Sequence, residues 1–345
     1  MNQSYVNTTT ENTRIQRTRA LISPAVLAED IPLTAEVAHQ ITQARESIAA
    51  CIRGTDTRPL IIVGPCSVHD LDAARAYAER LAPVAESMRA ELNIVMRVYF
   101  EKPRTTVGWK GYINDPNLDE SFAVNQGLRG ARQLLAELTG MGLATATEFL
   151  DTTFGQYYSE FIAWAAIGAR TVESQVHRQL ASGLSMPVGI KNGTTGNLDV
   201  AADAIVAASH SHLFPSLSKE GAPVLLETAG NPDCHLVMRG GGGKTNYAEE
   251  DISTAVELLE ARGISNGIMV DCSHGNSQKD HRRQAEVARN VLQQRQQNGR
   301  IVGLMLESHL EPGRQDKPEK FGCSITDACM GWSETEQLLQ ELAAL

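Results

Sequence analysis

The sequence predicts a (β/α)8 barrel with an N-terminal helical extension and a β-hairpin inserted between the fifth and sixth barrel strands. From residue 60 onward, short apolar runs alternate with helix-like stretches, which indicates a parallel sheet with covered faces. Every apolar run ends near a charged or metal-ligating residue, and the active sites of barrels are built on that edge. The 345 residues suffice for a barrel of about 250 residues with additions. The alternation alone would also fit a doubly wound sheet.

The N-terminal extension is expected to cover residues 1–55. Within it, residues 24–53 carry apolar positions at helical spacing, and Thr34 is a suitable N-cap. Gly54 follows, as is typical of the end of a helix. We therefore predict two domains, the extension at 1–55 and a catalytic barrel at 56–345.

Eight apolar runs are expected to form the barrel strands. In order they are LIIVGPC, NIVMRVYF, ATATEFL, AIGAR, PVGIKN, CHLVMRG, GIMVDCSH and GLMLESH. From Cys66 to Glu307 the strand ends are spaced by about 34 residues on average, the size of a βα unit. Two further runs, HLFPSL and APVLLETAG, interrupt the alternation and predict the inserted hairpin at about 212–230.

The residues near the strand ends strengthen the case for a closed barrel. They are Cys66, Arg97, Glu148, Arg170, Lys191, Arg239, His274 and Glu307. A barrel brings all its strand ends to one face, whereas an open sheet would spread them along a line. The simpler interpretation, that charged residues cap buried strands, explains some of these positions but not the whole set.

Composition excludes several classes of protein. The net charge of −10 and the pI of about 5.4 argue against a general nucleic-acid binder. No stretch approaches the roughly 18 apolar residues of a membrane helix, and the start, MNQSYVNTTTENTR, lacks the apolar region of a signal peptide. The six cysteines form no C-x-x-C pair. We expect a cytoplasmic protein with reduced thiols and no nucleic-acid or membrane partner.

The first group of candidate site residues is cationic. It comprises Arg97, Lys102, Arg104, Arg170, Lys191 and Arg239. Taken singly, each would more often be a surface salt-bridge residue. Converging on one barrel face, buried cations need anionic partners, and arginine suits bidentate contacts to phosphate or carboxylate. The group predicts one substrate with several negative charges or two anionic substrates.

The second group consists of Cys66, His274, Glu307 and Asp327. Thiolate, imidazole and carboxylate are the ligands that transition-series divalent ions take. Alone, Cys66 would more often be a buried structural thiol, and His274 a histidine satisfied within the core. Their shared placement at strand ends predicts a metal site.

One motif points elsewhere. MRGGGGKT, residues 238–245, follows a strand and resembles a phosphate-binding P-loop, but Met238 stands where that motif needs glycine. We expect the glycines at 240–243 to form a tight turn at the barrel mouth instead.

Longer motifs now support an assignment to a family. GPCSVHD, RVYFEKPRTTVGWKG, ATATEFLD, GARTVESQVHRQLASGLS, VGIKNGT, DCSHGNSQKDHRRQ and SITDACMGW together resemble the 3-deoxy-D-arabino-heptulosonate 7-phosphate (DAHP) synthases, in the short class regulated by aromatic amino acids. The resemblance runs from about residue 14 to the C-terminus. It implies a barrel transferase that condenses phosphoenolpyruvate with erythrose 4-phosphate at the entry of the shikimate pathway. In a sister family that uses arabinose 5-phosphate, the segment matching KPRT differs.

The resemblance also implies roles for both groups. Arg170, Arg239 and the backbone N–H of Ala169 match the phosphoenolpyruvate phosphate site, and Arg97, Lys102 and Lys191 match the clamp on its carboxylate. Arg104 and Thr105 match the residues that hold erythrose 4-phosphate. Cys66, His274, Glu307 and Asp327 match the ligands of a divalent metal, which is manganese, iron, cobalt or zinc. We expect Lys102 to be the general acid, His274 to act mainly as a ligand, and Glu148 to act indirectly.

Regulation is expected from the same class. Residues 1–55 and the hairpin match segments that make subunit contacts in a homodimer or homotetramer and help to form an effector site. Gly155, Gln156 and Ser185 match effector-pocket positions. Gly155 replaces a proline of some relatives, which favours tryptophan over tyrosine or phenylalanine without deciding among them.

Two readings from other functional classes stay open at this stage. A metal-dependent aldolase or lyase acting on a single sugar phosphate would need fewer phosphate-binding cations. A non-enzymatic sugar-phosphate sensor would have no use for the ligand set. Cys329 could also approach Cys66, and a disulfide between them would remove a metal ligand.

Overall fold

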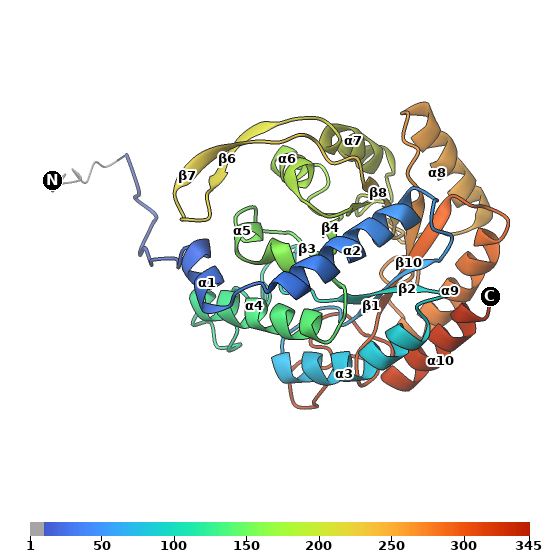
Figure 1. Cartoon of the computed structure of the whole chain (residues 1–345), viewed down its shortest axis with the longest axis horizontal. Coiled ribbons are helices and arrows are strands. Elements are labelled where there is room, and N and C mark those ends of the chain that lie inside the picture. Colours follow the sequence, from blue (N-terminus) through green and yellow to red (C-terminus); the bar gives the residue numbers. More distant parts are fainter. Residues whose placement is uncertain (1–9) are drawn as a thin grey trace.

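The structure is a computed structural model that describes residues 10–345, so the first nine residues of the predicted extension lie outside it (Figure 1). Parallel strands close into a barrel in the order β1-β10-β9-β8-β5-β4-β3-β2. They are β1 (Leu60–Gly64), β2 (Asn93–Arg97), β3 (Thr145–Glu148), β4 (Trp164–Ile167), β5 (Val188–Lys191), β8 (Cys234–Met238), β9 (Ile268–Asp271) and β10 (Ile301–Glu307). All eight predicted strands are present, and the closure confirms the barrel and excludes a doubly wound sheet.

The strands are buried on both faces, which explains why they are nearly continuous apolar runs. Alternate residues such as Ile62, Val95 and Met305 fill the barrel interior, while their neighbours pack against the surrounding helices. Those helices are α3 (Leu71–Ser87), α4 (Val124–Gly140), α6 (Gln175–Gly183), α7 (Asp199–Ala208), α8 (Glu249–Ala261), α9 (Gln284–Arg295) and α10 (Trp332–Ala343). Short turns also occur at α5 (Gly155–Tyr158), η1 (Ser159–Phe161) and η2 (His281–Arg283).

The helical stretch predicted at 24–53 is two helices, α1 (Pro24–Asp30) and α2 (Ala35–Ile52). Pro32 lies between them and cannot continue a helix, because it lacks the backbone N–H. The Thr34 side chain accepts a hydrogen bond from the N–H of Val37 at 3.3 Å, which confirms the predicted N-cap. Ile48 and Ile52 of α2 pack against the residues inside the barrel. In Figure 1, α2 accordingly runs across the barrel.

The predicted hairpin is formed by β6 (Leu213–Leu217) and β7 (Pro223–Glu227), which pair antiparallel between β5 and β8 in the chain. It extends away from the barrel toward the side where α1 lies (Figure 1). The N–H of Ala25 in α1 donates to the carbonyl of Lys219 in the hairpin at 2.7 Å. Leu213 and Leu225 are 61% and 66% exposed, so part of the hairpin's apolar surface faces outward. Across residues 10–345, no helix combines the length and apolarity needed to span a membrane.

Candidate active site

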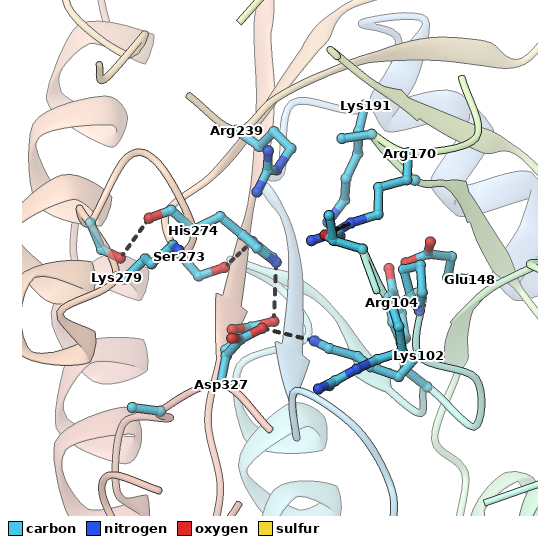
Figure 2. Close-up of a pocket in the computed structure, with 18 of the residues that line it drawn as sticks. Lys102, Arg104, Glu148, Arg170, Lys191, Arg239, Ser273, His274, Lys279 and Asp327 are labelled. Atoms are coloured by element: carbon cyan, nitrogen blue, oxygen red, sulfur yellow. Dashed lines mark hydrogen bonds and ion pairs between the residues drawn. The ribbon is translucent and has the colours of Figure 1, made fainter. Parts of the chain in front are cut away.

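A cleft of about 450 Å³ opens at the carboxyl ends of the barrel strands. It gathers residues that the sequence placed at strand ends and in the KPRT segment (Figure 2). Those residues are Arg97, Lys102, Arg104, Thr105, Glu148, Ala169, Arg170, Lys191, Arg239, His274, Glu307 and Asp327. Barrel closure therefore brings both predicted groups to one site.

Three of the four predicted metal ligands form a compact group. One ligand atom each from Cys66, Glu307 and Asp327 lies within 4.8 Å of the others. The fourth, His274, places Nε2 3.7 Å from Oε1 of Glu307. Burial, and then the charge of Glu307, raise the pKa of Cys66 to about 12, so the thiolate needs a nearby cation. A soft sulfur, an imidazole and two carboxylates fit a transition-series divalent ion.

Lys102 reaches into this group from the loop after β2. Its Nζ lies 2.8 Å from Sγ of Cys66 and 2.8 Å from Oδ2 of Asp327, a contact that Figure 2 shows as a dashed line. Burial alone would lower the pKa of Lys102, but Cys66, Asp327 and Glu307 raise it above its ordinary value. The ammonium is therefore held charged, and the donor set attracts a cation.

Arg97 buttresses the same group from the end of β2. Its guanidinium donates to the carbonyl oxygens of Pro65 and Cys66 at 3.0 and 3.1 Å and to Oε1 of Glu307 at 3.1 Å. The guanidinium also lies 3.5 Å from the centre of the Tyr99 ring. These contacts hold both Arg97 and the Glu307 carboxylate in place.

Asp271 is a site residue that sequence reasoning missed. Its buried carboxylate lies 2.9 Å from Nζ of Lys191 and 2.9 Å from Nδ1 of His274, and it accepts from Oγ of Ser273 at 2.6 Å. Burial would raise the pKa of Asp271, but Lys191 and His274 hold it well below its usual range. A carboxylate on Nδ1 directs Nε2 toward the metal group. The position three residues before His274 in DCSH was the available signal.

The cleft contains other lining residues that the sequence did not indicate. They are Tyr99, Ser273, Ser277, Lys279, His281 and Arg314. Lys279 and His281 come from the turn after His274, where His274, Gln278 and Lys279 have positive φ. Arg314 comes from the long loop after β10. Apart from His281, which begins η2, these residues lie on loops, whose path across the barrel mouth is not a local property of the sequence.

The cationic side of the cleft brings the KPRT loop next to the loop after β4. Nε of Arg170 donates to Oγ1 of Thr105 at 3.0 Å. The N–H of Arg239 donates to Oδ1 of Asn192 at 2.8 Å, which fixes the start of the loop after β8. Figure 2 shows Arg239, Lys191 and Arg170 together on one side of the cleft. This geometry suits an anion held by several cations.

Position 168, just before Ala169, needs glycine because a larger side chain there would displace Glu148. A Cβ at position 168 would lie 2.1 Å from Oε1 of Glu148, an atom that is buried without a hydrogen-bond partner among residues 10–345. We expect Gly168→Ala to lower kcat/KM by about ten- to a hundredfold while costing about 1 kcal/mol of unfolding free energy, since the flexible Glu148 side chain can move. Thermal melts and steady-state kinetics would measure both effects.

Gly140→Ala is the matched control, because a Cβ there meets no atom within 4 Å. Equal kinetics for the two variants would show that the position of Glu148 does not matter.

The glycines at 240–243 form a turn as predicted. Gly240, Gly242 and Gly243 have positive φ, and the N–H of Gly241 donates to the carbonyl of Lys244 at 2.9 Å. The next helix begins only at Glu249, whereas a P-loop leads directly into one. The structure therefore contains no P-loop at this position.

The cysteines at positions 51, 66, 234, 272, 323 and 329 are free and buried. Cys272 packs in the core around the barrel and is absent from the metal group. The Cys66–Cys329 disulfide considered from sequence is not formed.

A second pocket of about 320 Å³ lies between α5, the end of α6 and the hairpin. The three predicted effector positions, Gly155, Gln156 and Ser185, all line it. Its charged residues are Arg45, Glu160 and Lys219, which sequence reasoning missed. Nζ of Lys219 donates to the carbonyl of Gln156 at 2.6 Å, which ties the hairpin to α5.

Comparison with known proteins gives consistent results. The chain is 48% identical over 343 residues to the Phe-sensitive phospho-2-dehydro-3-deoxyheptonate aldolase of Escherichia coli K12, covering 98% of each chain. It is 49% identical over 340 residues to the Trp-sensitive enzyme of the same strain, covering 97% of each. The solved structure of phospho-2-dehydro-3-deoxyheptonate aldolase from Francisella tularensis SCHU S4 matches with a TM-score of 0.94 at 47% identity, over 96% of this chain and 98% of that one. Residues 31–340 match the sequence profile of the DAHP synthetase I family. The chain belongs to the DAHP synthetase I family.

Proposed function

We propose that the chain is a DAHP synthase, a transferase that condenses phosphoenolpyruvate with erythrose 4-phosphate and water to give DAHP and inorganic phosphate. This reaction is the first step of the shikimate pathway, which leads to the aromatic amino acids. The observation that carries the proposal is the single cleft in which a cation cluster faces a Cys, His and carboxylate group. The two phosphorylated substrates require the cation cluster, and the metal requires the Cys, His and carboxylate group.

Phosphoenolpyruvate binds on the cationic side. Arg170, Arg239 and the N–H of Ala169 hold its phosphate, while Arg97, Lys102 and Lys191 face its carboxylate. Erythrose 4-phosphate binds through Arg104 and Thr105. The contact between Arg170 and Thr105 supports this arrangement, because it brings the two binding loops within 3.0 Å of each other.

Cys66, His274, Glu307 and Asp327 would hold the divalent ion, which is manganese, iron, cobalt or zinc. The compact spacing of three of these ligands and the aim of His274 Nε2 toward Glu307 support the set. When bound, the ion supplies Lewis-acid polarisation of the aldehyde oxygen of erythrose 4-phosphate.

The reaction follows from the positions of the protein groups. The arginines and Lys191 orient phosphoenolpyruvate so that its C3 attacks the aldehyde carbon. Lys102, which is held as an ammonium, protonates the alkoxide, a far stronger base than its own amine. Water adds at C2, and Glu148 acts indirectly by balancing the charge of the surrounding cations. The hemiketal phosphate then collapses with C–O cleavage to release inorganic phosphate, while the cations that held the phosphate stabilise the departing charge.

The test is release of inorganic phosphate from phosphoenolpyruvate. We expect release to require erythrose 4-phosphate, to stop after chelation, and to return with an added divalent ion. Release without the second substrate would contradict the condensation. Cleavage of one sugar phosphate alone would favour an aldolase, and substrate binding without any reaction would favour a sensor.

We further propose that the second pocket binds an aromatic amino acid that inhibits the enzyme. Gly155, Gln156 and Ser185 contribute to its wall. Gly155 stands where some relatives have proline, and the smaller residue in the pocket wall favours tryptophan as the effector. The matched relatives include Phe-sensitive and Trp-sensitive enzymes, which supports regulation but not one effector.

We assign residues 1–55 to regulation and subunit contacts, and residues 56–345 to the catalytic barrel. The exposed leucines of the hairpin support a homodimer or homotetramer, because an apolar surface of this kind is commonly covered by another subunit.

A further inference from the structure

Glu101 is a buried carboxylate with no role in the substrate or metal contacts described above. It is 2% exposed and stands at the base of the loop that carries Lys102, Arg104 and Thr105. A buried carboxylate is retained only where hydrogen bonds compensate for lost hydration. Its partners therefore indicate what it does.

The partners of Glu101 belong to a different loop. The carboxylate accepts hydrogen bonds from the N–H of Asp151 at 3.1 Å and from the N–H of Leu150 at 3.3 Å. Both N–H groups lie on the segment that leaves β3 just after Glu148. Glu101 thus ties the loop after β2 to the loop after β3.

The segment held by Glu101 continues directly into the wall of the second pocket. Oδ1 of Asp151 accepts from the N–H of Thr153 at 2.7 Å and of Phe154 at 3.2 Å, which turns the chain into α5. Thr152, Gly155 and Gln156 line the second pocket. Only a few residues separate the partners of Glu101 from a ligand bound there.

Aromatic packing also connects the same two loops to α5. Tyr158 of α5 stacks on Phe149 with ring centres 5.7 Å apart and meets Phe100 edge-on at 6.2 Å. Burial and then the charge of Asp151 raise the pKa of Glu101 to about 8. The carboxylate is therefore sensitive to any movement of Asp151.

We infer that Glu101 is the positioning residue that couples the second pocket to the loop that binds erythrose 4-phosphate, an inference that rests on the proposed substrate and effector sites. An effector that shifts residues 152–156 displaces the N–H groups of Leu150 and Asp151, and Glu101 transmits that shift to the neighbouring Lys102 loop. The effector therefore weakens the binding of erythrose 4-phosphate. By linkage, erythrose 4-phosphate weakens the binding of the effector by the same factor.

The experiment measures this factor by calorimetry. L-tryptophan, with L-phenylalanine in parallel, is titrated into the metal-loaded enzyme with and without saturating erythrose 4-phosphate and with no phosphoenolpyruvate. For the wild type we expect the effector Kd to rise by roughly 5- to 150-fold when the sugar phosphate is present. In Glu101→Ala the rise should fall to about twofold or less, while the effector Kd without sugar phosphate stays within about threefold of wild type.

Two variants serve as controls. Glu101→Gln should keep the wild-type factor, because the amide oxygen still accepts from both N–H groups. Asp115→Ala should also keep it. That carboxylate is also buried and lies in the same loop region, but among residues 10–345 it accepts only from the N–H of Glu120, which belongs to the same loop region.

A wild-type factor in Glu101→Ala would overturn the inference and leave the proposed sites intact. Absence of effector binding to the wild type would overturn the proposed regulatory site and the inference with it. Amide hydrogen exchange of the wild type tests the same contact without a variant. Erythrose 4-phosphate should alter exchange across residues 150–156, and unchanged exchange there would also overturn the coupling.

Discussion

Lys102→Met should lower kcat by about 10³-fold while the enzyme still binds a divalent ion. A positioned general acid contributes roughly 10²- to 10⁴-fold to rate, and methionine fills similar space without a proton to donate. In the structure the ammonium of Lys102 contacts Cys66 and Asp327, so its removal leaves that thiol and that carboxylate free to bind the ion. Metal affinity should therefore be retained. Steady-state phosphate release and calorimetric titration with Mn²⁺ would measure the two quantities.

Lys110→Met is the matched control, because Lys110 lies in the same loop but is exposed and outside the cleft. The control should keep near-normal turnover. A near-normal rate in Lys102→Met would contradict its role as general acid. Loss of the metal in that variant would assign Lys102 to holding the ligands instead.

Cys66→Ala should weaken Mn²⁺ binding by at least about a hundredfold and abolish phosphate release. The thiol is completely buried beside Glu307 and Asp327, and an alanine there offers no ligand atom. Loss of one of the four proposed ligands removes a large part of the binding free energy of a transition-series ion. Equilibrium dialysis with Mn²⁺ and the phosphate assay would measure the effect.

Cys272→Ala separates this effect from simple loss of core volume. Cys272 is equally buried but packs in the core outside the metal group. Both variants should lose a similar amount of stability, of the order of 1 kcal/mol, while only Cys66→Ala loses the metal. Wild-type Mn²⁺ affinity in Cys66→Ala would remove Cys66 from the ligand set.

The sequence predicted the barrel and the hairpin because both follow from local patterns. Each strand is a short apolar run, and each run is buried on both faces, so the pattern is readable without knowledge of its partners. The break between α1 and α2 was not predicted, although Pro32 is a local signal that a helix ends there. In that case the apolar periodicity on either side outweighed the proline in the interpretation.

The candidate site was predicted less completely. Arg170, Lys191 and Glu307 were placed correctly in the cleft, because each stands at or just after the end of an apolar run. Asp271 was missed because its short spacing to His274 does not reveal Lys191 as a second partner, and its contacts with both form only in the folded chain. The charged residues of the second pocket come from three separate segments and could not be grouped from sequence.

The sequence by itself therefore determined the alternation of strands and helices, the residue types at the strand ends and, through long motifs, the family. Only the tertiary structure decided which of those residues touch. It placed Lys102 between Cys66 and Asp327, and it tied Glu101 to Leu150 and Asp151. The physical reason is that a strand end is a local feature of the chain. A contact between residues far apart in sequence exists only once the barrel closes and its loops fold over the same face.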